Sequence, residues 1–112
     1  MIPPFTDDVF LSNIETIPGR EIVKVCGLVQ GSTIRAKHVG RDIMAGLKNI
    51  VGGELTGYTE LLQESRAEAT GRMVAQALEL GANAVVNVRY STASITNGAA
   101  EILAYGTAVN IS

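Results

Sequence analysis

The feature that most constrains the fold is the dipeptide Asn97-Gly98, which lies between two segments rich in β-forming residues. An Asn-Gly pair readily adopts the positive φ angles that a two-residue hairpin turn requires. The flanking segments, residues 84–95 and 101–111, are therefore predicted to pair as antiparallel strands.

The segment 101–111 has two unlike faces. Bulky side chains at its odd positions alternate with Ala104, Gly106 and Ala108 at even positions. A face of small residues permits close approach of another layer of structure. We therefore expect the even positions to meet that layer.

A further strand is predicted over residues 21–30, between the turn signal Pro18-Gly19 and Gly31. Its even positions are mixed in polarity, whereas its odd positions are wholly apolar: Val23, Val25, Gly27 and Val29. Side chains alternate across a strand, so the odd positions are expected to face the core and the even positions to be half solvated. The short apolar run 9–11 predicts a brief edge strand.

Two helices are expected between these strands. Apolar residues recur at spacings of three and four over residues 36–51, until Gly52-Gly53 interrupts the pattern. A longer helix is predicted from Thr56 or Thr59 to about Leu80, ended by Gly81.

Two details of the longer helix carry expectations of their own. Glu68 stands four residues before Arg72, the favourable order for a helical ion pair worth about 0.2–0.5 kcal/mol. Gly71 costs roughly 1 kcal/mol relative to alanine in mid-helix. A close crossing with another backbone would explain its presence.

These elements predict a two-layer α+β fold, with an antiparallel sheet carrying helices on one face. A chain of 112 residues forms one domain, here residues 9–112, preceded by an arm over residues 1–8. The other face of such a sheet would expose apolar residues, including Ile22 and Leu28. An exposed apolar face implies a partner, and self-association into a closed ring is the expected solution.

Composition excludes several classes of function. A net charge of -2 does not supply the basic surface that nucleic-acid binding needs. No segment approaches the roughly 20 apolar residues that span a bilayer, and the first eight residues lack the pattern of a signal peptide. A single cysteine fits a reducing, cytoplasmic location.

Metal binding has two candidate soft ligands, Cys26 and His38. Zinc or copper sites need three or four converging ligands, and one subunit offers two of these at most. Cys26 is therefore interpreted first as a small strand or interface residue. His38 is interpreted first as a solvated histidine.

The charged residues around position 40 form the more interesting cluster. The cluster contains Arg35, Lys37, Arg41 and Asp42. It is interpreted first as a salt bridge between two subunits and second as a site for an anion. Glu54 stands near the predicted start of the long helix, where its charge competes with anions for the free N–H groups.

Enzymatic signatures are weak. Residues 52–59 resemble a phosphate-binding loop, but Tyr58 stands where the lysine is required and a helix is predicted before the loop. One histidine and no nucleophile-elbow sequence argue against hydrolase chemistry. A non-enzymatic protein is therefore expected.

Several segments, in order, resemble the small bacterial YbjQ family, labelled as heavy-metal-binding. They are residues 31–43 (GSTIRAKHVGRDI), 52–54 (GGE), 58–61 (YTEL), 81–89 (GANAVVNVR) and 105–109 (YGTAV). The resemblance runs from about residue 9 to the end. It implies a dodecin-like subunit with sheet order 1-3-2, assembled as a homopentamer through extra short strands.

Three hypotheses for function follow. The first is a cytoplasmic, non-enzymatic homopentamer that binds a small ligand or ion at subunit interfaces; its candidate residues are Arg35, Arg41, Asp42 and Glu54. The second is a heavy-metal-binding protein that uses Cys26 and His38, with a metal ion as its cofactor. The third is a structural or protein-interaction module without a ligand.

Overall fold

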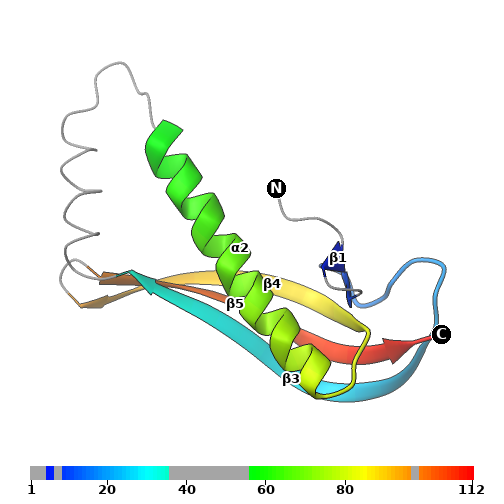
Figure 1. The fold of residues 1–112 in the computed structure, drawn as a ribbon. Helices are drawn as coiled ribbons and strands as arrows, with labels where there is room; N and C mark the ends of the chain where they lie inside the picture. Colours follow the sequence, from blue (N-terminus) through cyan, green and yellow to red (C-terminus); the bar gives the residue numbers. More distant parts are fainter. Residues whose placement is uncertain (1–4, 7–8, 36–55, 97–98) are drawn as a thin grey trace.

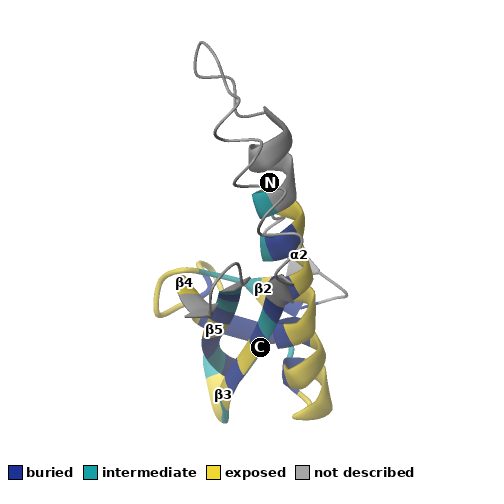
Figure 2. Cartoon of the chain, turned by 90° about the vertical axis from the view of Figure 1, so that its left-hand side faces the viewer, coloured by how far each residue is buried: buried dark blue, intermediate teal, exposed yellow. Residues whose placement is uncertain are grey.

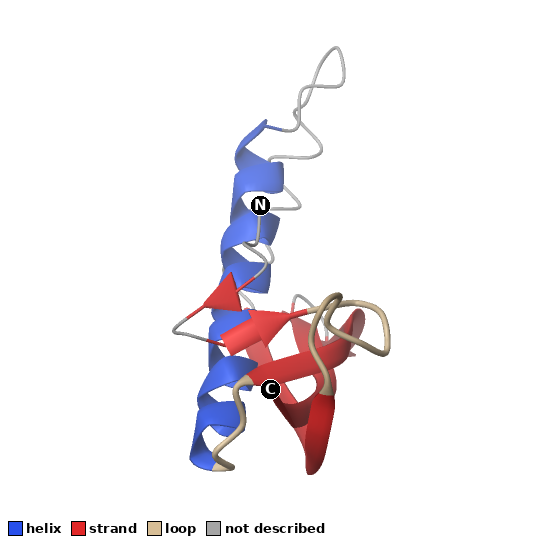
Figure 3. Cartoon of the chain, turned by 90° about the vertical axis from the view of Figure 1, so that its right-hand side faces the viewer, coloured by secondary structure: helices blue, strands red, loops and turns tan. Residues whose placement is uncertain are grey.

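The computed structural model describes residues 5–6, 9–35, 56–96 and 99–112. One helix lies against one face of a five-stranded sheet, which confirms the α+β class and its two layers (Figures 1 and 3). The elements are β1 (Phe5–Thr6), β2 (Val9–Leu11), β3 (Ile22–Arg35), α2 (Thr56–Glu79), β4 (Ala84–Thr96) and β5 (Ala99–Ile111). The helix predicted over residues 36–51 lies outside the described residues.

The sheet is mixed, with strand order β1-β2-β4-β5-β3. The predicted hairpin is confirmed, because β4 and β5 pair antiparallel along almost their whole length. β5 also pairs antiparallel with β3 on its other side. β2 runs parallel to β4, and β1 pairs antiparallel with β2. The run 9–11 is therefore a strand as predicted but not an edge strand, since β1 lies outside it.

The long helix is confirmed in position and length. α2 spans Thr56–Glu79 and is followed by Gly81 at φ 77°, a left-handed conformation typical of the residue that ends a helix. The Ala82 N–H donates to the Ala77 carbonyl at 3.0 Å, which satisfies one carbonyl of the last turn. The expected Glu68–Arg72 ion pair is present at 2.7 Å.

Gly31 does not end its strand, contrary to the prediction, because β3 continues to Arg35. Its role is to let α2 approach. A Cβ built on Gly31 would lie within 3.0 Å of the Ala69 carbonyl oxygen and the Met73 nitrogen, and 2.7 Å from the Arg72 Cβ. The helix backbone therefore rests directly on the strand at this point.

Gly71 has no such role, and the predicted close crossing at this residue is wrong. Gly71 is exposed, and among the described residues no atom outside its own helix turn lies within 4 Å of a Cβ built on it. The tight contact between helix and sheet is provided by the strand glycine, because Gly71 points away from the sheet.

The main core lies between α2 and the sheet, where buried positions line the helix side that faces the strands (Figure 2). Ala104 and Ala108 of β5 are fully buried there against Ala69 and Met73 of α2, as the small face of this strand predicted. Gly106 lies between them in β5 and fits against β4, since a Cβ would come within 2.8 Å of Val85 Cγ1.

A second apolar cluster lies on the sheet face opposite α2. It contains Ile17, Ala84, Val86, Val109 and Ile111, with Ile22 packed against it. Ile17 comes from the segment before β3, and this segment turns at Pro18-Gly19. The Arg20 N–H donates to the Ile17 carbonyl at 3.0 Å, and Gly19 takes φ 80°, the geometry of a type II turn. The segment that carries Ile17 therefore covers one end of this sheet face.

Two β-bulges at the start of β3 overturn the predicted face pattern. Register shifts fall between Ile22 and Lys24 and between Val25 and Gly27, so Val23 and Cys26 are inserted residues. Each insertion reverses the alternation of side chains. Consequently Val23 and Val25 are 63% and 65% exposed rather than in the core, whereas Val29 beyond the bulges is buried as expected.

The two glycines give a matched test of this packing. Gly31→Ala would force the helix away from the strand, and we expect a loss of roughly 1–3 kcal/mol or more in the free energy of unfolding. Gly71→Ala places a methyl group in open space and should stabilise the helix by up to about 1 kcal/mol. Urea unfolding followed by circular dichroism measures both. Equal effects of the two substitutions would contradict the contact.

Candidate functional site

The candidate site is an exposed apolar surface on β3, the strand at one edge of the sheet. Val23, Val25 and Leu28, here called the β3 patch, are 63%, 65% and 86% exposed. β-branched and leucine side chains at such exposure gain free energy when another surface covers them. Part of the predicted exposed face is therefore present, although Ile22 itself is half-buried against the second cluster.

The β3 patch adjoins further partly exposed side chains on the sheet face opposite α2. Leu28 pairs with the half-buried Thr107, and the next pair on this face joins Gln30 with Tyr105, which is 41% exposed. This part of the face lies beyond the cluster that Ile17 covers. The alternation of the sequence predicts the exposure of Leu28, whereas the bulges expose Val23 and Val25, which the alternation assigns to the core.

Cys26 lies where β3, β5 and the end of α2 meet. Its thiol donates to Asn110 Oδ1 at 3.0 Å, and Asn110 Nδ2 in turn donates to the Gly81 carbonyl at 2.8 Å. The side chain is half-buried and packs against the main core. This arrangement gives Cys26 a structural role, because its hydrogen bond orients the amide that holds the turn after α2.

The described part of the chain does not itself assemble a metal site. Within residues 5–6, 9–35, 56–96 and 99–112 no group of three or more His, Cys, Asp or Glu side chains is placed to hold an ion. Cys26 is the one candidate metal ligand from the sequence that falls in this part. His38 lies outside it.

Three of the four predicted ligand-binding residues lie outside the part of the chain that the structure describes. Arg35 is the last residue of β3, and its backbone lies opposite Ala100 of β5. Arg41, Asp42 and Glu54 lie outside the described residues, so the predicted cluster stays a prediction.

Sequence reasoning missed a set of contacts between α2 and the edge of β3. Gln76 and Arg72 of α2 bond to backbone groups of Gln30 and Ser32. The partners are 46 and 40 residues apart in the chain, so local sequence patterns carry no signal for these contacts. The one local hint was the i,i+4 pair of Glu68 with Arg72.

The family model YbjQ_1, described as "Putative heavy-metal-binding", matches residues 9–112. The chain belongs to the YbjQ family.

Relatives in this family are close in sequence across bacteria and archaea. A UPF0145 protein of Hahella chejuensis is 67% identical over 101 residues, covering 90% of this chain and 97% of the relative. A UPF0145 protein of Archaeoglobus fulgidus is 56% identical over 104 residues, which cover 93% of this chain and 96% of the relative. These names describe a family whose function is uncharacterised.

A solved structure shares the fold at low sequence identity. The crystal structure of a DUF74-family protein of unknown function from Pediococcus pentosaceus superimposes with a TM-score of 0.60 at 16% identity. The match covers 93% of this chain and 98% of that one. The α+β arrangement is therefore shared with a distant protein. Among the described residues, no helix combines the length and the apolar character needed to cross a bilayer.

The structural role of Cys26 predicts a mild effect of Cys26→Ser. A serine hydroxyl can still donate to Asn110 Oδ1, so we expect unfolding free energy to change by less than about 1.5 kcal/mol. Cys26→Ala removes the donor and serves as the comparison. If metal content measured by elemental analysis falls with Cys26→Ser while the fold is intact, the thiol is a ligand and the structural assignment is wrong.

Proposed function

We propose that this protein is a cytoplasmic, non-enzymatic homopentamer that binds a small ligand or ion where its subunits meet. The observation that carries the proposal is the β3 patch, whose most exposed residue, Leu28, is 86% exposed. Covering a leucine side chain contributes about 1.5–3 kcal/mol, and the patch repeats in every subunit. A closed ring covers the patch once per subunit and leaves none exposed.

The composition favours association between copies of this chain over binding to a highly charged partner. Charged residues make up only 18% of the chain, and the net charge of -2 gives little repulsion between copies. The sheet also ends in short strands, β1 and β2, which pair at the edge opposite β3. In a dodecin-like ring these short strands would join neighbouring subunits.

The ligand in this proposal is a small molecule or an ion. Arg35 stands at the end of β3, and Arg41 follows six positions later in the chain. Guanidinium groups bind carboxylate and phosphate oxygens in pairs of hydrogen bonds, which suits them to a shared interface site. Asp42 and Glu54 would orient the two arginines or contribute oxygens to a cation.

The family description favours one alternative, a metal-binding protein that uses Cys26 and His38. Cys26 already donates to Asn110, so metal binding would have to replace this hydrogen bond. A five-fold ring of thiols also does not match the tetrahedral geometry of zinc. A structural or interaction module without a ligand is the third form of the proposal.

Native mass spectrometry of untagged protein, purified without chelator, tests the assembly and the ligand in one spectrum. We expect five subunits and a reproducible extra mass that identifies a metal or an organic molecule. Five subunits without added mass, and without a melting shift on adding metals or anions, would favour the structural module. A monomer at micromolar concentration would contradict the proposed assembly.

The β3 patch has a matched control in α2. Leu28→Ser should shift the native mass toward smaller species, while the circular dichroism spectrum of the variant stays that of the folded chain. Leu78→Ser alters another leucine, 46% exposed on the helix, and should leave the assembly unchanged. Retention of the pentamer by Leu28→Ser would place the interface elsewhere.

Arg41→Ala separates ligand binding from assembly. If the arginine holds the ligand, the variant should keep the subunit number and lose the extra mass. Loss of the pentamer itself would instead show that Arg41 bridges subunits, which would make the residue structural.

A further inference from the structure

The outer edge of β3 is held by side chains of α2. At the edge of a sheet every second residue points its N–H and C=O away from the neighbouring strand. The Gln30 N–H donates to Gln76 Oε1 at 2.9 Å, which shows that Gln30 is one of these outward residues. Ser32 is the next, and Arg72 Nη1 donates to its carbonyl oxygen.

The geometry of helix and strand makes this pairing repeat. α2 runs in the direction opposite to β3, so Gln76 meets Gln30 and Arg72 meets Ser32 (Figure 1). Four residues of helix advance about 6 Å, and two residues of strand advance about 6.7 Å. Side chains one helical turn apart therefore match successive outward groups of the strand.

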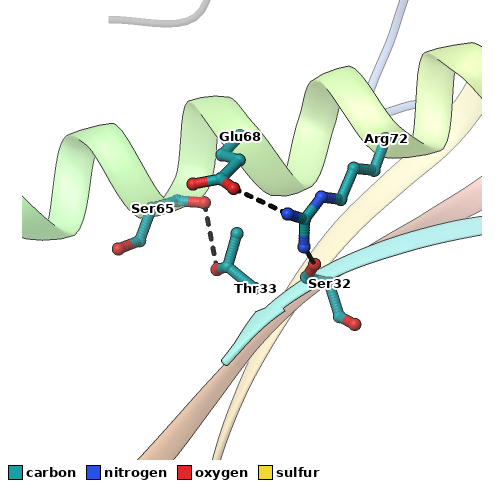
Figure 4. Close-up of polar contacts among 5 residues, drawn as sticks. All are labelled: Ser32, Thr33, Ser65, Glu68 and Arg72. Carbon is teal, nitrogen blue, oxygen red and sulfur yellow. Dashed lines mark hydrogen bonds and ion pairs between the residues drawn. The ribbon is translucent and has the colours of Figure 1, made fainter. Parts of the chain in front are cut away.

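Arg72 is itself fixed in place. Its Nη2 donates to Glu68 Oε1 at 2.7 Å, one turn earlier in α2, while its other terminal nitrogen reaches Ser32 (Figure 4). Beside them the Thr33 hydroxyl donates to the Ser65 carbonyl at 3.3 Å, which holds the same part of the strand against the helix. Together these contacts join α2 to β3 at three residues of the strand, Gln30, Ser32 and Thr33.

The protection ends where the helix side chains become apolar. The next position in this series is Leu80, directly after the end of α2; its side chain reaches the strand near Gly27 and cannot bond to a backbone group. Leu28 follows Gly27 in the strand; it is the outward residue before Gln30 and the most exposed member of the β3 patch. The edge of β3 is thus divided into a segment covered by polar side chains and an apolar segment.

We propose that Gln76 and Arg72 act as a guard that prevents a second copy of this chain from adding a strand to the edge of β3 at Gln30 and Ser32. The guard occupies the hydrogen-bonding positions that an incoming strand would use. An exposed strand of 14 residues carrying valines and a leucine would otherwise be a template for continued strand addition. Contact between copies is thereby limited to the apolar part of the strand.

The test is the double substitution Arg72→Ala/Gln76→Ala in the full chain. We expect species larger than those of the unsubstituted protein in light scattering, with increased thioflavin T fluorescence as concentration rises. The control, Gln63→Ala/Glu79→Ala, truncates two exposed α2 side chains and should behave as the unsubstituted protein. The conservative pair Arg72→Lys/Gln76→Glu keeps a donor and an acceptor and should restore the original size. A folded double variant of unchanged size would overturn the proposal.

A single substitution covers the case in which the double variant does not fold. In Gln76→Ala the Gln30 amide loses its acceptor, so its hydrogen exchange should become faster by roughly two- to tenfold, whereas Gln76→Glu should retain the slow rate. Exchange mass spectrometry of peptides from β3 measures this change. Unchanged exchange of the peptide containing Gln30 would overturn the guard. Each variant is compared with the unsubstituted protein, whatever its number of subunits. The result therefore does not depend on whether the protein is a pentamer.

Discussion

The structure depends on the contact between the backbone of α2 and Gly31 of β3. A side chain at this position would collide with the helix main chain at Ala69 and Met73. Ala69, Ala104 and Ala108 are fully buried between the two layers, together with larger side chains such as Met73 and Val74. Among the described residues the buried core consists of aliphatic side chains and Met73 without an aromatic ring, in keeping with the aromatic content of 4%.

The close approach also decides what happens at the edge of the sheet. With the helix resting on β3, Gln76 and Arg72 reach past the strand to its outward backbone groups. The bulges at the start of the strand have the opposite effect, because they turn Val25 away from the core. One strand therefore combines a covered part and an apolar exposed part, and the proposed assembly uses only the second.

The sequence could identify candidate functional residues only where they form part of a contiguous motif. The resemblance to the YbjQ family was confirmed, and it rested on contiguous segments such as residues 31–43 and 81–89. The surroundings of Cys26 could not be predicted, because its partner Asn110 lies 84 residues away on another strand. The roles of Arg35, Arg41, Asp42 and Glu54 stay predictions, since side-chain contacts for these residues are not part of the described structure.

The sequence by itself determined the local elements: the hairpin around Asn97-Gly98, the helix that ends before Gly81, the turn at Pro18-Gly19 and the Glu68–Arg72 pair. Each depends on residues within a few positions of one another, whose conformational preferences act locally. Only the tertiary structure decided the function of Gly31, the reversal of Val23 and Val25, and the cover over the edge of β3. These features depend on which segments meet across the sheet. Packing between distant segments overrides both the side-chain alternation expected for a strand and the tendency of a glycine to end it.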